Sequence, residues 1–248
     1  MLNLSNKHWL IIEIVIWFTT LYWYYMSINN KQLKYEKALE YEIFIKEEYG
    51  FAKQEIKKAG CIFDIWWHKW YFSKRCRSLN PNAKIHYFEP IGEFYQQAKI
   101  NLWNDKNIIF NNYWIAPKSE KWTILLNQEK TMQSSKYSSF LNPNWTEIVV
   151  NFISLKDYLE QGNIDKIDVL KMDIEWMEFE VFGSRWDFEW WKINNLIAEI
   201  HLLNDEMKSE RNAIFSDIKN KFPATEIFNS SYRNEVFLVR ACDNSNLK

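Results

Sequence analysis

The sequence predicts an α/β protein in which helices cover both faces of a doubly wound, mostly parallel sheet. From residue 61 onward, short apolar runs of strand length alternate with segments whose apolar residues recur at helical spacing. Strands that alternate with helices form parallel sheets that are buried on both faces. The chain also ends in two strand-like runs separated by a turn, which adds an antiparallel pair to the same sheet.

The amino-terminal segment carries an apolar run at residues 8–28 that is interrupted only by Glu13. A helix needs about 20 apolar residues to cross a bilayer, so we expect residues 1–30 to form a membrane anchor. A buried or interfacial helix is the alternative interpretation. Residues 31–59 alternate charged and apolar positions and predict a helical stalk or linker. Lys31, Lys34 and Lys37 follow the run and only Lys7 precedes it, so the positive-inside rule places the remaining chain on the cytoplasmic side.

The predicted strands and helices follow in order through a domain at residues 60–242, with a tail at 243–248. Buried strands are expected at residues 61–65, 85–89, 107–112, 167–173 and 194–202. Helices are expected at residues 71–79, 92–103, 154–161, 175–182 and 204–221. The closing strands are expected at residues 225–230 and 234–241. Two more strand-like runs, at 122–126 and 147–152, predict a β excursion over the sheet edge.

Charge and metal-ligand patterns exclude several classes of protein. The net charge is −1 and the isoelectric point is about 6.5, so the chain lacks the basic excess that binds nucleic-acid backbones. The three cysteines and four histidines are scattered, without the paired spacing of a disulfide framework or a zinc site. We therefore expect no nucleic-acid partner and no bound metal.

The carboxyl ends of the strands are where functional residues are expected, because ligands of doubly wound sheets bind there. Asp64 ends the first strand, and a nucleotide-binding fold would need glycines in the loop that follows. That loop reads Trp66-Trp67-His68-Lys69-Trp70. Glu89 ends the second strand and lies 25 residues beyond Asp64. An acid at about this spacing from the first strand binds the ribose in nucleotide-binding folds. A surface glutamate is the alternative interpretation.

Four ordered motifs resemble those of the FkbM-type methyltransferase family. They lie within residues 60–203 and are Asp64 to Trp70, Phe88-Glu89-Pro90, Asp168 to Glu178 and Ala198-Glu199-Ile200-His201. The resemblance implies a Rossmann-like, seven-stranded enzyme that depends on S-adenosylmethionine, with strand order 3-2-1-4-5-7-6. The resemblance also implies which residues bind the cofactor. Glu89 would bind the ribose, Pro90 and Ile91 would lie beside the adenine, and Asn112 would lie at the adenine edge. The other implied cofactor-binding residues are Asp64, Trp66, Trp67, Trp70 and Asp173.

Asp64 also favours a cationic cofactor over a dinucleotide on physical grounds. A carboxylate attracts an amino group or a sulfonium, whereas it repels a pyrophosphate. A nicotinamide-dependent dehydrogenase is therefore a weaker alternative, and the closing antiparallel pair of strands disfavours it further.

Methyl transfer to a hydroxyl needs a base for the departing proton, and the fourth and fifth predicted strands supply candidates. Side chains two apart on a strand share a face, so Asp173 pairs with Lys171 or Glu175, and Glu199 with His201. We expect Asp173 or His201 to be the base, with Lys171 and Glu175 in the same catalytic group. A hydrogen-bonded network is the alternative, and a metal ion on this cluster is not expected. Two further acids are expected to decorate the following helix, Glu178 and Glu180.

The composition includes 5 glycines and 14 tryptophans, whereas about 17 glycines are usual at this length. The family's glycines at positions 66, 70 and 176 are all tryptophan here. We hypothesise that these codons are UGA, read as glycine in the source organism and written here as tryptophan. A truly tryptophan-rich protein with an obstructed loop is the alternative. Trp114 and Trp122 also stand at turn-like points where glycine would be ordinary.

These features predict a membrane-tethered O-methyltransferase that acts on a hydroxyl of a sugar, a glycan precursor or another small molecule. The alternative function is a non-catalytic, membrane-tethered scaffold with the same fold, because three indoles in the loop would exclude the cofactor.

Overall fold

The computed structural model describes residues 37, 52–66, 70–103, 105–127, 145–174, 177–183, 188–202, 207–229 and 236–242. The apolar run predicted as a membrane anchor lies outside these residues. Within them, no helix is long and apolar enough to cross a membrane.

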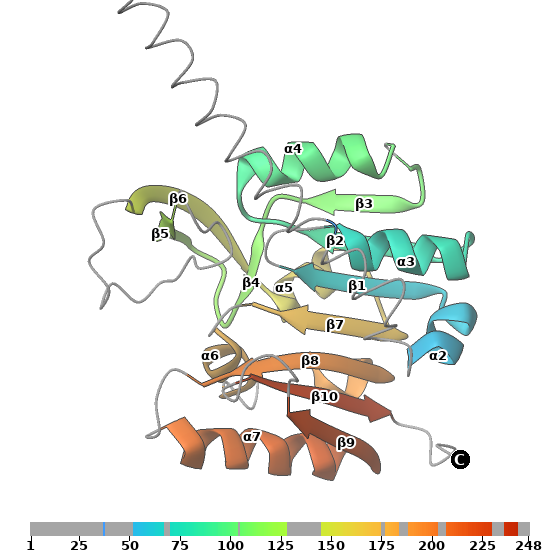
Figure 1. The fold of residues 1–248 in the computed structure, drawn as a ribbon, viewed down its shortest axis with the longest axis vertical. Coiled ribbons are helices and arrows are strands. Elements are labelled where there is room, and N and C mark those ends of the chain that lie inside the picture. Colours follow the sequence, from blue (N-terminus) through green and yellow to red (C-terminus); the bar gives the residue numbers. More distant parts are fainter. Residues whose placement is uncertain are drawn as a thin grey trace, which may run out of the picture. The chain divides into compact units, whose positions relative to one another are not determined.

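A seven-stranded sheet forms the centre of the domain (Figure 1). Its strands are β1 Cys61–Trp66, β2 Lys84–Phe88, β3 Ile108–Asn111, β7 Val169–Asp173, β8 Asn195–His201, β9 Ala224–Asn229 and β10 Val236–Cys242. They stand in the order β3-β2-β1-β7-β8-β10-β9. Strand β10 pairs antiparallel with both β8 and β9, and the other neighbours pair parallel.

The strands of this sheet agree with the sequence prediction, with end points that differ by one or two residues. The numbering of the observed order differs from the predicted one, because three strands between β3 and β7 in the chain belong to another sheet. Counted in chain order within the seven-stranded sheet alone, the strands stand as 3-2-1-4-5-7-6.

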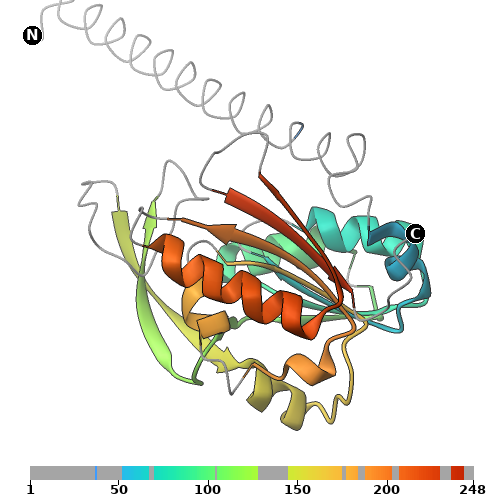
Figure 2. The ribbon, with the colours of Figure 1, turned by 90° about the horizontal axis from the view of Figure 1, so that it is seen from below.

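Helices cover both faces of the sheet (Figures 1 and 2). One face carries α2 Lys53–Lys58, α3 Tyr71–Leu79 and α4 Gly92–Asn101. The other face carries α5 Leu155–Gln161, α6 Glu178–Gly183 and α7 Lys208–Lys221. A 3-10 turn, η3 Trp190–Lys192, precedes β8. The apolar side chains of strands and helices meet between these layers and form the core, as expected for a sheet buried on both faces.

Helix α2 belongs to the domain, although the sequence placed its residues in the stalk. Ile56 of this helix is 1% exposed. The side-chain amide of Asn80, just after α3, donates to the carbonyls of Ile56 and Ala59 at 2.9 and 2.8 Å. These contacts fix α2 to the end of α3, so the domain begins before residue 60.

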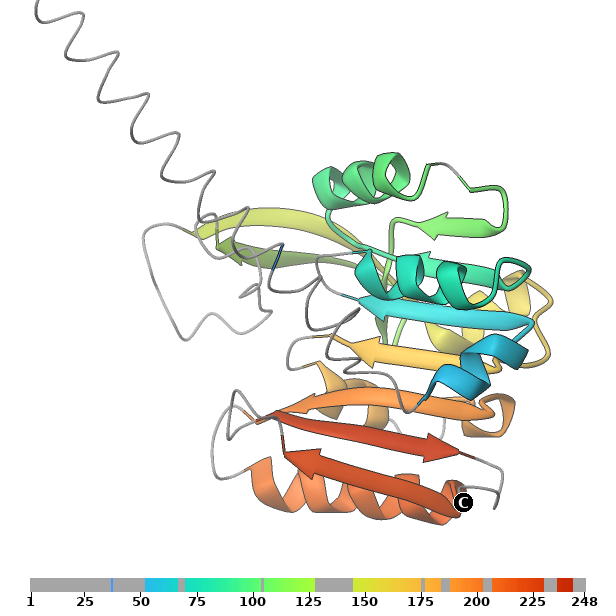
Figure 3. The same cartoon turned by 45° about the vertical axis from the view of Figure 1, so that its right-hand side comes forward.

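A second sheet of three strands forms the predicted β excursion. Its strands are β4 Trp114–Ala116, β5 Lys121–Asn127 and β6 Trp145–Ser154, in the order β4-β6-β5. Figure 3 shows β5 and β6 on the side to which the carboxyl ends of the parallel strands point.

Trp114 and Trp122 lie within strands, so the turn-like positions predicted for them are wrong. Trp114 is 2% exposed and packs edge-on against Phe152 at 5.4 Å, so its indole is part of the core.

The pairing register brings polar side chains together near the carboxyl edge of the sheet. Asp64 of β1 lies opposite Lys171 of β7, and Trp66 lies opposite Asp173. Register neighbours project to the same face of a sheet, as do residues two apart on one strand. Asp64, Lys171 and Asp173 therefore share one face near the strand ends.

Candidate active site

The end of β7 carries a buried ion pair. Lys171 is fully buried, and its Nζ lies 3.2 Å from Oδ2 of Asp173. Asp173 is 7% exposed, and its other oxygen, Oδ1, is buried without a hydrogen-bond partner. Most buried polar atoms in proteins are paired, so an orphaned carboxylate oxygen indicates a place for a ligand. The predicted pairing of Lys171 with Asp173 is confirmed.

His201 reaches the same place from the end of β8. Its Nδ1 lies 2.9 Å from Oε1 of Glu178. Its Nε2 lies 4.0 Å from Oδ1 of Asp173 and 4.0 Å from Oε2 of Glu199. An ionised carboxylate only accepts hydrogen bonds, so Nδ1 donates to Glu178, and in the neutral ring the lone pair is on Nε2. The two predicted base candidates, Asp173 and His201, therefore lie together.

Glu178 is a residue of the candidate site that the sequence reasoning missed. The sequence placed it as a decoration of the following helix, yet it is fully buried at the first position of α6. Its Oε1 also accepts a hydrogen bond from the backbone N–H of Ile174 at 3.2 Å. The two bonds hold the carboxylate against His201. The signal that could have indicated it is an acid in the first turn of a helix that starts close behind a buried strand.

Asp64 is another buried carboxylate, on the adjacent strand β1. Ser73 of α3 donates a hydrogen bond to its Oδ2, and its Oδ1 has no hydrogen-bond partner. Burial raises the pKa of Asp64 from 3.8 to about 6. The positive charge of Lys171 and the Ser73 hydrogen bond lower this pKa, whereas the charge of Asp173 raises it further. Four acids therefore lie at this edge of the sheet among the described residues: Asp64, Asp173, Glu178 and Glu199.

A second group of predicted residues meets at the ends of β2 and β3. Glu89 is fully buried, and its Oε1 accepts a hydrogen bond from the N–H of Ile91 at 2.8 Å. The side-chain amide of Asn112 donates to the carbonyls of Glu89 and Pro90 at 2.8 and 3.0 Å. The four residues predicted around the ribose and adenine thus form one connected group. Their roles in cofactor binding stay predictions.

The predicted cofactor loop is described at its two ends. The backbone of Trp66 ends β1, whereas residues 67–69, which include Trp67, lie outside the described residues. Glu175 and Trp176 also lie outside them. Trp70 immediately precedes α3 and is 7% exposed. An indole is therefore buried where the predicted loop meets its helix.

Trp103 adopts a backbone conformation that favours glycine. It follows the C-cap Leu102 of α4, its φ is 55°, and its N–H donates to the carbonyl of Ile100 at 3.1 Å. Helices commonly end in glycine at this left-handed position. Asn163 occupies the same position after α5, with φ 48° and an equivalent bond to Glu160, and asparagine tolerates this conformation. The indole of Trp103 is 89% exposed, so packing offsets little of the strain.

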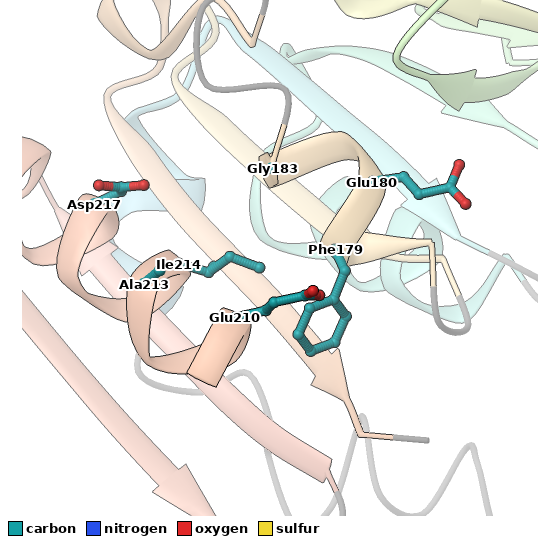
Figure 4. A pocket seen from close by; sticks show the side chains of 7 residues that line it. All are labelled: Phe179, Glu180, Gly183, Glu210, Ala213, Ile214 and Asp217. Atoms are coloured by element: carbon teal, nitrogen blue, oxygen red, sulfur yellow. The ribbon is translucent and has the colours of Figure 1, made fainter. Parts of the chain in front are cut away.

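A pocket of about 390 Å³ lies apart from these groups, between α6 and α7 (Figure 4). Its lining residues are Phe179, Glu180, Gly183, Glu210, Ala213, Ile214 and Asp217. None of them was predicted as a site residue, and none contributes to the cluster around His201. The candidate active site is therefore the cluster at the strand ends and not this pocket.

The sheet order and the acids at the ends of β1 and β2 define a Rossmann-like α/β protein whose site lies at the carboxyl edge. Residues 64–228 match the profile of the Methyltransferase FkbM domain. The chain therefore belongs to the FkbM methyltransferase family and is an S-adenosylmethionine-dependent methyltransferase.

Solved structures that resemble this chain are distant in sequence. Methyltransferase FkbM from Methylobacillus flagellatus KT is 10% identical, with a TM-score of 0.47 over 74% of this chain and 43% of that one. A methyltransferase from Pyrococcus furiosus is 11% identical, with a TM-score of 0.47 over 87% and 98% of the two chains. A SAM-dependent O-methyltransferase from Thermotoga maritima is 12% identical, with a TM-score of 0.44 over 83% and 67%. No curated protein matches the sequence at a significant level.

Proposed function

We propose that this methyltransferase transfers its methyl group to a hydroxyl oxygen of a sugar, a glycan precursor or another small molecule. The observation that carries the proposal is the environment of Nε2 of His201. The bond to Glu178 sets the lone pair on this atom, which lies 4.0 Å from the carboxylates of Asp173 and Glu199. A hydroxyl is a weak nucleophile until it loses its proton, so it is the acceptor that needs such an arrangement.

His201 acts as the base in this proposal. A hydroxyl that is hydrogen-bonded to Nε2 passes its proton to the ring while its oxygen attacks the methyl carbon. Glu178 keeps the ring in the tautomer that accepts this proton, and the nearby carboxylates stabilise the imidazolium that forms. A positioned base of this kind contributes about 10²–10⁴-fold to the rate.

The residues at this edge fit a cationic cofactor. S-adenosylmethionine, when bound, supplies a methyl group that is already activated by a positive sulfur. Asp64 and Asp173 each keep one buried oxygen without a hydrogen-bond partner, and these carboxylates favour a positive group beside them. We assign these two aspartates to the sulfonium and amino-acid end of the cofactor. The ribose and adenine end is assigned to Glu89, Pro90, Ile91 and Asn112.

The cofactor loop is part of the same proposal. We propose that positions 66, 70 and 176 are glycine in the natural protein, through UGA codons that its source organism reads as glycine. The φ of 55° at Trp103 supports this reassignment from a position outside the family motifs. Trp114 has no such support, because its indole packs inside the core.

Cofactor binding tests the first step of the proposal. The chain as written is compared with a version in which Trp66, Trp70, Trp103 and Trp176 are glycine. Calorimetric titration with S-adenosylmethionine is expected to show one site on the glycine version and much weaker binding to the written chain. Binding by neither version would contradict the cofactor assignment. UGG codons at the substituted positions would end the recoding hypothesis.

Turnover tests the acceptor class. Release of S-adenosylhomocysteine is measured over a panel of sugars, sugar nucleotides and other small hydroxyl compounds. His201→Asn is expected to lower kcat by at least about 10²-fold while cofactor affinity is kept. Glu180→Gln, which removes an acid from α6 outside the cluster, is the matched control. Transfer that is unaffected by His201→Asn, or that occurs only to nitrogen or sulfur acceptors, would contradict the proposal.

A further inference from the structure

We propose that Asp173, Glu199 and His201, a cluster for which the sequence predicted no metal, also form a binding site for one divalent metal ion. One ligand atom from each residue lies within 4.8 Å of the others. The binding site is inferred from these residues themselves, whereas the role given to the ion in turnover rests on the proposed function.

The spacing of the three atoms suits an ion between them. Nε2 of His201 lies 4.0 Å from Oδ1 of Asp173 and 4.0 Å from Oε2 of Glu199, which is too long for hydrogen bonds. Two ligand atoms that share one ion through bonds of about 2.0–2.2 Å lie about 3–4 Å apart. The three atoms lie within 4.8 Å of one another, so the widest pair needs to close by about 1 Å to hold an ion.

His201 is already oriented as a metal ligand. Its Nδ1 donates to the buried carboxylate of Glu178 at 2.9 Å, and its Nε2 lies 4.0 Å from an oxygen of Asp173 and from one of Glu199. Histidines that bind metals nearly always donate their other ring N–H to a carboxylate, a carbonyl or water. The pair of Glu178 and His201 therefore has the form of a ligand and its supporting carboxylate.

Asp173 supplies the second, independent observation. Its residue is 7% exposed, Lys171 binds its Oδ2, and its Oδ1 is buried without a hydrogen-bond partner. This orphaned oxygen is the one nearest to Nε2 of His201, at 4.0 Å. A buried carboxylate oxygen without a donor is costly unless a cation meets it.

The donor set points to a first-row transition ion such as Mn²⁺, Fe²⁺ or Zn²⁺. One imidazole nitrogen and two carboxylate oxygens form a mixed set, whereas Mg²⁺ and Ca²⁺ prefer oxygen ligands throughout. Three protein ligands leave coordination positions open, as in catalytic metal sites.

The acceptor hydroxyl is the ligand for an open position. A bound divalent ion lowers the pKa of coordinated water by several units and acts in the same way on an alcohol. The O–H bond of the acceptor breaks, its proton goes to water, and the electron pair stays on the oxygen and then forms the bond to the methyl carbon. With the ion bound, His201 is a ligand, and the ion replaces the imidazole in lowering the cost of deprotonation.

The test is a titration of the full chain with Mn²⁺ after treatment with a chelator, in the written and the glycine versions. Unbound Mn²⁺ is followed by its paramagnetic resonance signal, and we expect one ion per chain that Zn²⁺ displaces. Asp173→Asn and His201→Asn are each expected to weaken binding at least tenfold. Glu180→Gln is expected to bind Mn²⁺ as the unchanged protein does. Circular dichroism checks the fold, and Glu199→Gln replaces any variant that fails to fold.

Failure of this proposal is distinguishable from failure of the proposed function. No saturable Mn²⁺ binding, or binding that survives both substitutions, would overturn the metal site. Turnover that depends on His201 but not on added or removed metal would also overturn the metal site. That result would still support a hydroxyl methyltransferase with His201 as its base. Mn²⁺ binding that is lost in the variants supports the site even where no hydroxyl acceptor is turned over.

Discussion

Glu178 and His201 share a hydrogen bond of 2.9 Å that joins the first residue of α6 to the last residue of β8. Both side chains are almost fully enclosed, and the same Glu178 oxygen is held by the N–H of Ile174. The bond decides which ring nitrogen carries the lone pair. In the proposed mechanism Glu178 is therefore a positioning residue that acts on the acceptor through His201.

Glu178→Gln tests this positioning role. The amide keeps the shape of the side chain but can turn its NH₂ group toward Nδ1, which forces the wrong tautomer on His201. We expect kcat to fall by at least about tenfold, with the affinity for S-adenosylmethionine and the melting temperature little changed. Steady-state kinetics and calorimetry measure the split, with Glu180→Gln as the control. An equal loss of cofactor affinity would indicate a general structural defect instead.

Trp103→Gly is expected to stabilise the protein. A residue other than glycine in the left-handed region costs about 1–2 kcal/mol, and the extra freedom of glycine in the unfolded chain offsets part of that gain. The net gain is about 0.5–1 kcal/mol, or a rise of about 1–4 °C in Tm by thermal unfolding. Asn163→Gly, at the same position after α5, is the control and should change Tm less. A lower Tm for Trp103→Gly would show that its indole is needed.

The strands of the sheet could be predicted because strands that are buried on both faces have short, nearly continuous apolar sequences. The acids at strand ends could be predicted because the topology places them and the family motifs name them, as for Asp64 and Asp173. Glu178 also closes one of these motifs, yet its contact with His201 could not be predicted, because a helix of six residues is too short for its spacing to show which acid turns inward. The orientation of the Glu178 side chain is set by the docking of α6 against β8, and the local sequence does not indicate that contact.

The docking of helix α2 against the domain escaped prediction for a related reason, although its helical conformation was predicted. Four of its six residues are charged, as in a solvated stalk, and Ile56 is its buried apolar residue. What holds it is the side chain of Asn80, which donates to backbone carbonyls more than twenty positions earlier in the chain. A contact of that kind depends on how α3 ends, so it has no periodic signature in the sequence.

Asp64→Asn is expected to raise stability and weaken cofactor binding. The pKa of Asp64 is raised by burial to about 6 in the folded protein, so its contribution to stability is complete below pH 3.8 and is lost as the pH rises through about 6. At pH 8 the wild type therefore carries the cost of a buried charge, and the variant does not. The gain in Tm should be small at pH 4 and largest above pH 6.

Calorimetry with S-adenosylmethionine completes this test. The negative charge of Asp64 destabilises the protein without cofactor, and we propose that the same charge binds the cationic cofactor. We expect at least a tenfold loss of affinity in Asp64→Asn. Ser73→Ala, which removes the donor to Asp64 but keeps its charge, is the control and should retain much more of the affinity. Undiminished affinity in Asp64→Asn would remove this residue from the cofactor site.

His86 is expected to make the fold sensitive to acid. Its ring stacks on Phe63 at 4.6 Å, and its Nδ1 lies 2.7 Å from the hydroxyl of Tyr158, which itself donates to Asn111. The hydrogen of Tyr158 is thus used, so Nδ1 donates to the phenol oxygen, and Nε2 is buried without a partner. Burial, with a further contribution from Lys84, lowers the pKa of His86 from 6.5 to about 4.

The sign of this effect follows from the proton balance. Between about pH 4 and 6.5 the unfolded chain binds a proton at His86 that the folded protein excludes, so stability is full above pH 6.5 and falls as the pH is lowered. The slope reaches at most about 1.4 kcal/mol per pH unit. Asp64 acts oppositely in an overlapping range, so the measurement is made in the Asp64→Asn background. There, His86→Phe should lower stability at pH 7.5 through the lost Tyr158 bond, yet flatten its dependence on pH in urea unfolding. An unchanged slope would mean that His86 is protonated in the folded protein.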